Sequence, residues 1–373
     1  MIIMNRFLFY LFLFTLSLIS LPVLASAPVI QAKAAVLMDM KTGQVVWERN
    51  SRDPLPPAST TKVLTAILAY DMGNTNKLCA VSPKAASVGE ASIHLKAGEK
   101  ILLGDLLKGA LICSGNDACV AIAENVSGSE SLFVQWMNLK AKILGAGSSE
   151  FVNTNGLPAK DHYVTAYDLA LISRYAMQNP QFSAVVGSRY QTIGQGTSKR
   201  YLKSTNKLLW QYPGCIGIKT GTTVSAGPCL VSAGERGEKK FLSVVLNSPD
   251  RFGDSSKLLD YGLEDFSSRT LFHRGDLIRT VPVINGMKKT VAVIISQDET
   301  VVLPKQQTKV PQTEIFIQEQ LAAPVQKGQS LGHIDVLDNN RGLLSRINIV
   351  ADESIPERLT LWEKLKRLCQ LVI

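Results

Sequence analysis

Residues 57–62 read Pro57-Ala58-Ser59-Thr60-Thr61-Lys62 and precede an apolar run that predicts a helix. Positions three apart share one face of a helix, so Ser59 and Lys62 are expected within hydrogen-bonding distance of each other. A serine with a lysine beside it is a nucleophile that carries its own base. A serine at a helix start is also a common N-cap, so the pair needs support from other motifs.

Two later motifs complete a set of three. Ser114-Gly115-Asn116 follows an apolar run at a turn, and Lys219-Thr220-Gly221 lies in a predicted strand. Taken singly, Ser114 reads as a helix cap, Asn116 as a turn former and Lys219 as a solvated strand residue. Together the motifs occur in the order S-x-x-K, S-x-N and K-T-G, which coincidence does not explain.

This set resembles the motifs of the low-molecular-mass penicillin-binding proteins, the serine-type D-Ala-D-Ala carboxypeptidase family, which are relatives of the class A β-lactamases. The likeness extends to Asn153-Thr154-Asn155-Gly156-Leu157, to residues 217–223 and to residues 322–328. The resemblance implies an α+β, β-lactamase/transpeptidase-like fold. Its five-stranded antiparallel sheet is flanked by helices, a helical lobe carries Ser114 and Asn116, and a small all-β domain follows.

Hydrophobic patterns favour the same arrangement. Alternating apolar residues in 34–48 predict a hairpin, and strand patterns return in 215–246. Helical patterns, punctuated by Gly, Pro and Asn, fill much of the region between. Strands early and late with helices between them favour a helical lobe inserted into a sheet, with the site in the seam.

The 373-residue chain is longer than one hydrophobic core usually organises. We expect a signal peptide at residues 1–25, the peptidase domain at 28–272, a small β-sandwich at 276–351 and an amphipathic helix at 355–373. No catalytic grouping falls in the predicted β-sandwich, so it reads as a spacer or an interaction module.

The first segment has one cation, Arg6, before an apolar run from Phe7 to Val23. It ends in small residues that favour cleavage after Ala25. A retained single-span anchor is the alternative, because the apolar run is long for a signal peptide. Both interpretations predict an exported protein.

The last segment places Leu361, Trp362 and Leu365 on one helical face and Lys364 and Lys366 on the other. This composition is typical of a helix that lies in a membrane interface. The 13 residues from Leu361 to Ile373 are too few to span a bilayer. The sequence therefore predicts attachment to the outer face of the cytoplasmic membrane. Docking on the β domain and pairing with a second copy are the alternatives.

The composition is basic, with 40 Lys and Arg against 31 Asp and Glu and a net charge of +9, or +8 after cleavage at residue 25. Such a charge suits an anionic wall or membrane surface. No dense Lys/Arg run is interleaved with aromatic residues, which argues against a nucleic-acid partner. The six dispersed cysteines are expected to be free thiols. The four histidines are scattered, and we predict no metal and no cofactor.

The requirements of peptide-bond cleavage predict a role for the residues of each motif. Ser59 attacks the carbonyl of a D-Ala-D-Ala bond, and Lys62 takes the proton of Ser59 if its own amine is neutral. A dry pocket and the nearby cation Lys219 both lower the pKa of a lysine. Ser114 passes a proton towards the leaving amine. Asn116 holds Lys62 and the substrate amide by hydrogen bonds.

The substrate is expected to dock as an extended peptide on the edge of the Lys219 strand, where Gly221 leaves room. The resemblance implies an oxyanion hole made by the backbone N–H groups of Ser59 and Thr222. It also implies that the terminal carboxylate meets Thr220, Thr223 and Arg251. Relatives with a histidine at the position of Thr222 exist, so the rate of deacylation is left open.

The predicted function is removal of the terminal D-alanine from peptidoglycan stem pentapeptides through an acyl-Ser59 intermediate, with β-lactams as inhibitors. A D,D-endopeptidase would use the same atoms. A class A β-lactamase uses a glutamate from an E-x-x-L-N stretch, which Glu150-Phe151-Val152-Asn153 does not match. A catalytically inert β-lactam-binding scaffold is disfavoured by the intact Ser59, Lys62 and Lys219.

Overall fold

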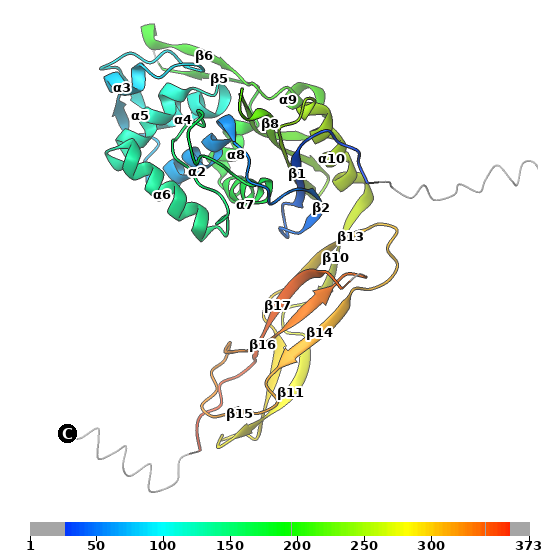
Figure 1. Ribbon diagram of the computed structural model, residues 1–373. Helices are drawn as coiled ribbons and strands as arrows, with labels where there is room; N and C mark the ends of the chain where they lie inside the picture. Colours follow the sequence, from blue (N-terminus) through cyan, green and yellow to red (C-terminus); the bar gives the residue numbers. More distant parts are fainter. Residues whose placement is uncertain (1–26, 195, 340, 359–373) are drawn as a thin grey trace, which may run out of the picture.

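The computed structural model describes residues 27–358, apart from 195 and 340, as an α+β part followed by an all-β domain that extends away from it (Figure 1). The first part contains a five-stranded antiparallel sheet with helices around it, which confirms the predicted fold class. The predicted signal peptide and residues 359–373 of the predicted C-terminal helix lie outside these residues. The predicted start of that helix at residue 355 is wrong, because Ile355 and Glu357 form antiparallel β-bridges with Val325 and Gly286. Among the residues described, no helix is both long enough and apolar enough to cross a bilayer.

The five-stranded sheet joins the two ends of the α+β part. Its strands lie in the order β2-β1-β9-β8-β7, so the N-terminal hairpin pairs with strands that come much later in the chain. Strand β7 is at the edge of the sheet, where only one of its sides is paired. The strands are β1 (Ala34–Asp39), β2 (Val45–Arg49), β7 (Cys215–Thr223), β8 (Gly227–Arg236) and β9 (Lys239–Leu246).

Helices cover both faces of this sheet. Because side chains alternate along a strand, Leu37 and Val245 pack against α10 (Arg251–Asp265), whereas Val36 and Val244 enter a second core on the other face. That larger core is shared with the helical lobe. The remaining helices are η1 (Ala58–Thr61), α2 (Lys62–Met72), α3 (Pro83–Ala86), α4 (Leu103–Ile112), α5 (Asn116–Ser127), α6 (Glu130–Ile143), α7 (Ala166–Ala176), α8 (Pro180–Val186), η2 (Gly196–Ser198) and α9 (Leu208–Gln211).

Two small hairpins complete the helical lobe. The pair β3–β4 precedes α4, and the pair β5–β6 leads from α8 towards the edge strand β7. These strands are β3 (Leu78–Ala80), β4 (Lys100–Leu102), β5 (Tyr190–Ile193) and β6 (Arg200–Lys203).

The β domain contains a six-stranded sheet in the order β14-β16-β17-β12-β11-β15 and a two-stranded ribbon, β10–β13. Both contribute to one apolar core. The strands are β10 (Phe266–Phe272), β11 (Leu277–Ile284), β12 (Thr290–Ile295), β13 (Glu299–Pro304), β14 (Gln312–Ile317), β15 (Leu321–Ala322), β16 (Ser330–Leu337) and β17 (Leu343–Ala351).

The strand pairing corrects the predicted end of the peptidase domain at residue 272. Strand β10 follows α10 directly and pairs along its length with β13, so it belongs to the β domain by hydrogen bonding. Its sequence gave no break, because the chain passes from helix to strand at Asp265–Phe266 without a glycine or proline.

The Gln44 side chain links the α+β part to the β domain by two hydrogen bonds. The Gln44 side chain donates from Nε2 to the carbonyl oxygen of Val302 at 2.7 Å and accepts from the Val302 N–H at 2.8 Å. Val302 also packs into the core beneath α10. The ribbon β10–β13 is therefore held against the α+β part by both polar and apolar contacts.

Asp254 fixes the N-terminal segment to α10 and supplies a test of the fold. Its fully buried carboxylate accepts from the backbone N–H groups of Gln31 and Ala32 and from the Ser248 hydroxyl, at 2.6–3.0 Å. We expect Asp254→Ala to lower the free energy of unfolding by about 3 kcal/mol, because buried donors lose their acceptor. Glu264→Ala on the same helix removes only an exposed ion pair with Arg236 and should cost under about 1 kcal/mol. Equal losses in denaturant titrations would contradict this account.

Candidate active site

Ser59 lies in a tight turn just before a helix. Residues Ala58–Thr61 form the 3₁₀ turn η1, and α2 begins at Lys62. Ser59 and Lys62 are thus one turn apart on the same side, as the S-x-x-K spacing predicts. The Lys62 Nζ lies 2.8 Å from the Ser59 Oγ.

The Lys62 amine is fully buried among three oxygen atoms. Besides the Ser59 hydroxyl, it contacts the side-chain Oδ1 of Asn116 at 2.7 Å and the backbone carbonyl oxygen of Asn155 at 2.5 Å. A neutral amine has two N–H donors and one lone pair. Two donors match Asn116 and Asn155, and the lone pair is left to accept the Ser59 proton. The site therefore accommodates Lys62 in its basic form.

Burial lowers the pKa of Lys62 to about 8, against the raising effects of Cys119, Glu90 and Asp117. The charge of Lys219 was expected to contribute to this lowering of the Lys62 pKa. In the structure, burial is the cause that acts on Lys62. At pH 7, one unit below this pKa, about a tenth of the protein then carries Lys62 as a free base.

Lys219 is also buried and lies on the edge strand β7. Its Nζ donates to the carbonyl oxygen of Thr220 at 2.9 Å. Burial, and next the charge of Lys62, lower the pKa of Lys219 well below its usual value. The charge of Lys62 therefore opposes the charging of Lys219, and an anionic ligand beside Lys219 would favour its charged form.

The S-x-N motif lies where α4 gives way to α5. Ser114 has a positive φ of 65° in this turn and is buried. Asn116 opens α5 and donates from Nδ2 to the Gly89 carbonyl at 3.0 Å, which turns its Oδ1 towards Lys62. The structure thus brings the predicted Asn116 into contact with Lys62 and places Ser114 in the adjoining turn.

The K-T-G strand and Arg251 lie together. The Arg251 guanidinium donates to the Gly221 carbonyl at 2.8 Å and to the Thr222 hydroxyl at 2.7 Å. Thr223 lies at the end of β7, and its hydroxyl accepts from the Ala226 N–H at 3.1 Å. The Thr220 hydroxyl is 2.6 Å from that of Thr205. Arg251 of α10 and the threonines of β7 that the sequence pointed to therefore lie along the same stretch of this strand.

Two glycines let neighbouring segments approach the serine turn. A Cβ on Gly221 would lie 2.9 Å from the backbone nitrogen of Ser59, so the close approach of β7 to η1 requires glycine. Gly156 has a φ of +88°, and a Cβ there would lie 1.8 Å from the Ala58 carbonyl oxygen. Gly221 was expected to leave room for the substrate, and in the structure it leaves room for the serine turn.

Two functional groups were missed from the sequence. The Asn155 carbonyl contacts Lys62, and only the resemblance of residues 153–157 marked this loop. A backbone oxygen has no side-chain signature. Thr205 follows β6 and reaches Thr220, and no motif in the sequence pointed to it.

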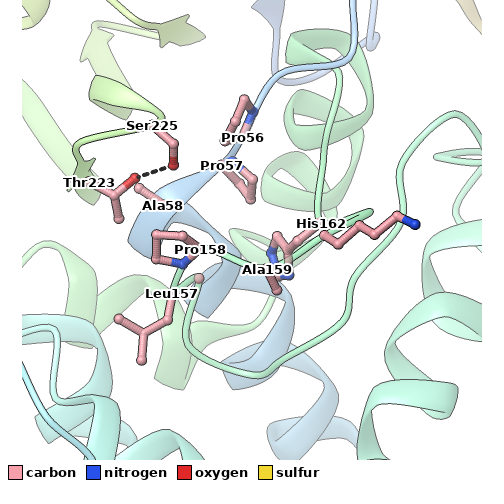
Figure 2. A pocket seen from close by; sticks show the side chains of 11 residues that line it. Pro56, Pro57, Ala58, Leu157, Pro158, Ala159, His162, Thr223 and Ser225 are labelled. Carbon is pink, nitrogen blue, oxygen red and sulfur yellow. Dashed lines mark hydrogen bonds between the residues drawn. The ribbon is translucent and has the colours of Figure 1, made fainter.

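A pocket of about 330 Å³ adjoins the serine turn (Figure 2). Figure 2 shows Thr223 and Ser225 on one side of it and Ala159 and His162 on the other, with Pro57 and Ala58 between them. Its walls are largely apolar. They are formed by Pro56, Pro57, Ala58, Gly156, Leu157, Pro158, Ala159, Lys160, His162, Thr223 and Ser225.

Acidic and sulfur side chains do not gather into a metal site in the described part of the chain, where no group of three or more His, Cys, Asp or Glu is placed to hold an ion. Five cysteines in that part are free thiols. The polar groups of the site are hydroxyls, amides, two lysines and the Arg251 guanidinium.

Comparison with known proteins gives the family. Residues 22–250 match the D-alanyl-D-alanine carboxypeptidase family, peptidase family S11. The chain belongs to this family. Residues 266–357 match the C-terminal domain of penicillin-binding protein 5, in agreement with the strand pairing of β10. The chain is therefore a peptidase and a low-molecular-mass penicillin-binding protein.

Individual relatives cover most of the chain. D-alanyl-D-alanine carboxypeptidase DacF of Bacillus subtilis is 33% identical over 87% of this chain and 86% of its own length. DacC of Escherichia coli is 33% identical over 92% of this chain and 89% of its own. The crystal structure of penicillin-binding protein 5 from Haemophilus influenzae superposes with a TM-score of 0.79 at 25% identity, and covers 89% of this chain and all of its own.

The state of Lys62 predicts a pH dependence. Its pKa is lowered, so the free base grows as pH rises towards about 8 and then levels off. We expect the second-order rate of acylation by a fluorescent penicillin to rise about tenfold per pH unit below that value, because only the free base takes the Ser59 proton. Lys62→Arg, which stays charged, should lose acylation at every pH. A rate that is flat between about pH 6 and pH 9 would count against Lys62 as the base.

Proposed function

We propose that this carboxypeptidase removes the terminal D-alanine from peptidoglycan stem pentapeptides through an acyl-Ser59 intermediate. The observation that carries the proposal is the fully buried Lys62 amine, 2.8 Å from the Ser59 Oγ and held by two other oxygens. Few surroundings keep a lysine in its basic form, and this one also places it against a hydroxyl.

Acylation begins when the Ser59 Oγ attacks the carbonyl carbon of the D-Ala-D-Ala bond and its proton passes to Lys62. The backbone N–H groups of Ser59 and Thr222 hold the developing oxyanion. Ser114 relays a proton to the departing amine, the C–N bond breaks and D-alanine leaves. Water then hydrolyses the ester, which releases the shortened peptide and restores Ser59.

The substrate lies along the free edge of β7. Its terminal carboxylate faces the cationic and hydroxyl groups of Lys219, Thr220 and Arg251, with Thr223 further along the strand. The stem residue before the two D-alanines then reaches the pocket in Figure 2, since an extended chain advances about 3.3 Å per residue. Backbone pairing at an open sheet edge suits such a peptide.

β-Lactams are expected to acylate Ser59 and leave slowly. The Glu150 carboxylate accepts from Asn138 at 2.9 Å, and the loop group that contacts Lys62 is the Asn155 carbonyl, which is not a base. A β-lactamase needs a carboxylate that activates water at this stage. This difference favours a penicillin-inhibited carboxypeptidase over a β-lactamase.

A D,D-endopeptidase remains the second candidate, because the free edge of β7 can also receive a cross-linked peptide. The inert scaffold is disfavoured by the contact between Ser59 and Lys62. Release of free D-alanine from a pentapeptide, compared with cleavage of a cross-linked dimer, separates the two activities.

We also propose that the protein is exported and lies on the outer face of the cytoplasmic membrane, attached through an amphipathic helix formed by residues after 358. The support is the composition of that helix and the leader at residues 1–25. The last described residues lie at the end of the β domain that is far from the α+β part, where the backbone N–H of Arg358 donates to the Asn285 carbonyl (Figure 1).

The nucleophile is tested with diacetyl-Lys-D-Ala-D-Ala. Ser59→Ala should release no D-alanine above background and form no covalent adduct with penicillin, because the attacking oxygen is gone. Its unfolding midpoint should stay close to that of the wild type. An active Ser59→Ala protein would exclude the proposed nucleophile.

The anchor is tested by truncation before Leu359. We expect the shortened protein to stay in the supernatant when membranes are sedimented, while the full-length protein pellets with them. Penicillin labelling should be the same for both, since the truncation leaves the described residues 27–358 intact. A truncated protein that still pellets would contradict attachment through this helix.

A further inference from the structure

A buried histidine bonds to the serine turn, and the mechanism above does not use it. His162 is only 6% exposed and lies in the loop that follows Asn155 and lines the pocket in Figure 2. Its Nδ1 is 3.1 Å from the backbone nitrogen of Val152, and its Nε2 is 3.0 Å from the hydroxyl of Thr61. Thr61 is a member of η1. The two ring nitrogens thus join the loop to the serine turn.

The directions of these bonds are fixed by chemistry. A backbone N–H can only donate, so Nδ1 must accept from Val152 and the ring proton must be on Nε2. His162 therefore donates to the Thr61 Oγ1, which in turn donates its own proton to the Ala58 carbonyl oxygen at 2.9 Å. Burial lowers the pKa of His162 to about 4, which agrees with a neutral ring.

This chain of hydrogen bonds ends at the peptide group between Ala58 and Ser59. The carbonyl of Ala58 and the N–H of Ser59 belong to one planar unit and point in opposite directions. A bond that fixes the Ala58 oxygen therefore also fixes the direction of the Ser59 N–H. Ala58 has a φ of 49°, which is unfavourable for a residue with a Cβ, so its peptide needs external support.

We propose that His162 is a positioning residue, which acts through Thr61 and Ala58 to aim the Ser59 N–H into the oxyanion hole. The proposal rests on the role of Ser59 given above. The expected effect lies in the chemical steps, acylation and deacylation, because the oxyanion forms in them and not in the first, non-covalent complex. Loss of the bond should slow the chemical step and leave ground-state binding nearly unchanged.

Two substitutions distinguish the hydrogen bond at Nδ1 of His162 from the hydrogen bond at Nε2. In His162→Gln the side-chain amide can place an N–H near the position of Nε2 and keep the bond to Thr61. In His162→Asn the shorter amide can place its oxygen near Nδ1, which keeps the bond from Val152 and loses the bond to Thr61. Both variants replace the same buried ring, so their general structural cost is matched.

The readout is stopped-flow acylation by a fluorescent penicillin, resolved into the dissociation constant of the first complex and the rate constant of acylation. We expect His162→Asn to lower the rate constant about tenfold or more at an unchanged dissociation constant, and His162→Gln to restore most of the rate. Similar rates in the two variants, or a loss confined to the dissociation constant, would overturn the proposal.

Thr61 gives a second test if either histidine variant fails to fold. Thr61→Ser keeps the hydroxyl and should acylate much faster than the isosteric Thr61→Val. In the Thr61→Val background, His162→Asn should add little further loss, because the bond is already broken. Additive losses would overturn the proposal. Penicillin labelling that persists in Ser59→Ala would instead overturn the proposed function, so the two failures are distinguishable.

Discussion

The burial of one lysine amine organises the whole catalytic part of this protein. Lys62 can serve as a base only where water is excluded, and its hydrogen-bonding groups then need partners inside the protein. Three separate segments supply them: the turn of Ser59, the start of α5 at Asn116 and the loop at Asn155. The sheet, the helical lobe and the loop must therefore all be in place before the serine becomes reactive.

The same constraint explains how closely the segments pack. The loop and the edge strand approach the serine turn at distances that only Gly156 and Gly221 permit. Ala58, between them, takes a backbone conformation that a residue with a Cβ rarely adopts. Its carbonyl is held by Thr61, and Thr61 is held by His162. Strain at the nucleophile is thus supported by a buried network rather than by the turn itself.

Much of the fold and site could be read from the sequence, and the rest has identifiable causes. Ser59, Lys62 and Asn116 were found because their spacing or motif reflects their contacts. The Asn155 carbonyl was missed because a backbone oxygen leaves no residue-specific mark. His162 lies 101 residues from Thr61, and only the tertiary fold brings them together. Strand β10 was assigned to the wrong domain because no turn residue separates it from α10.

The bond between Gln44 and Val302 has a mechanical consequence. A side-chain amide that exchanges two hydrogen bonds with a backbone behaves like one rung of a β-ladder, and it lies where two domains would otherwise swivel on a single connection. The β domain then works as a strut rather than a tether. With the membrane attachment proposed above, such a strut would hold the catalytic site at a set height above the bilayer, and peptidoglycan outside that layer would escape trimming.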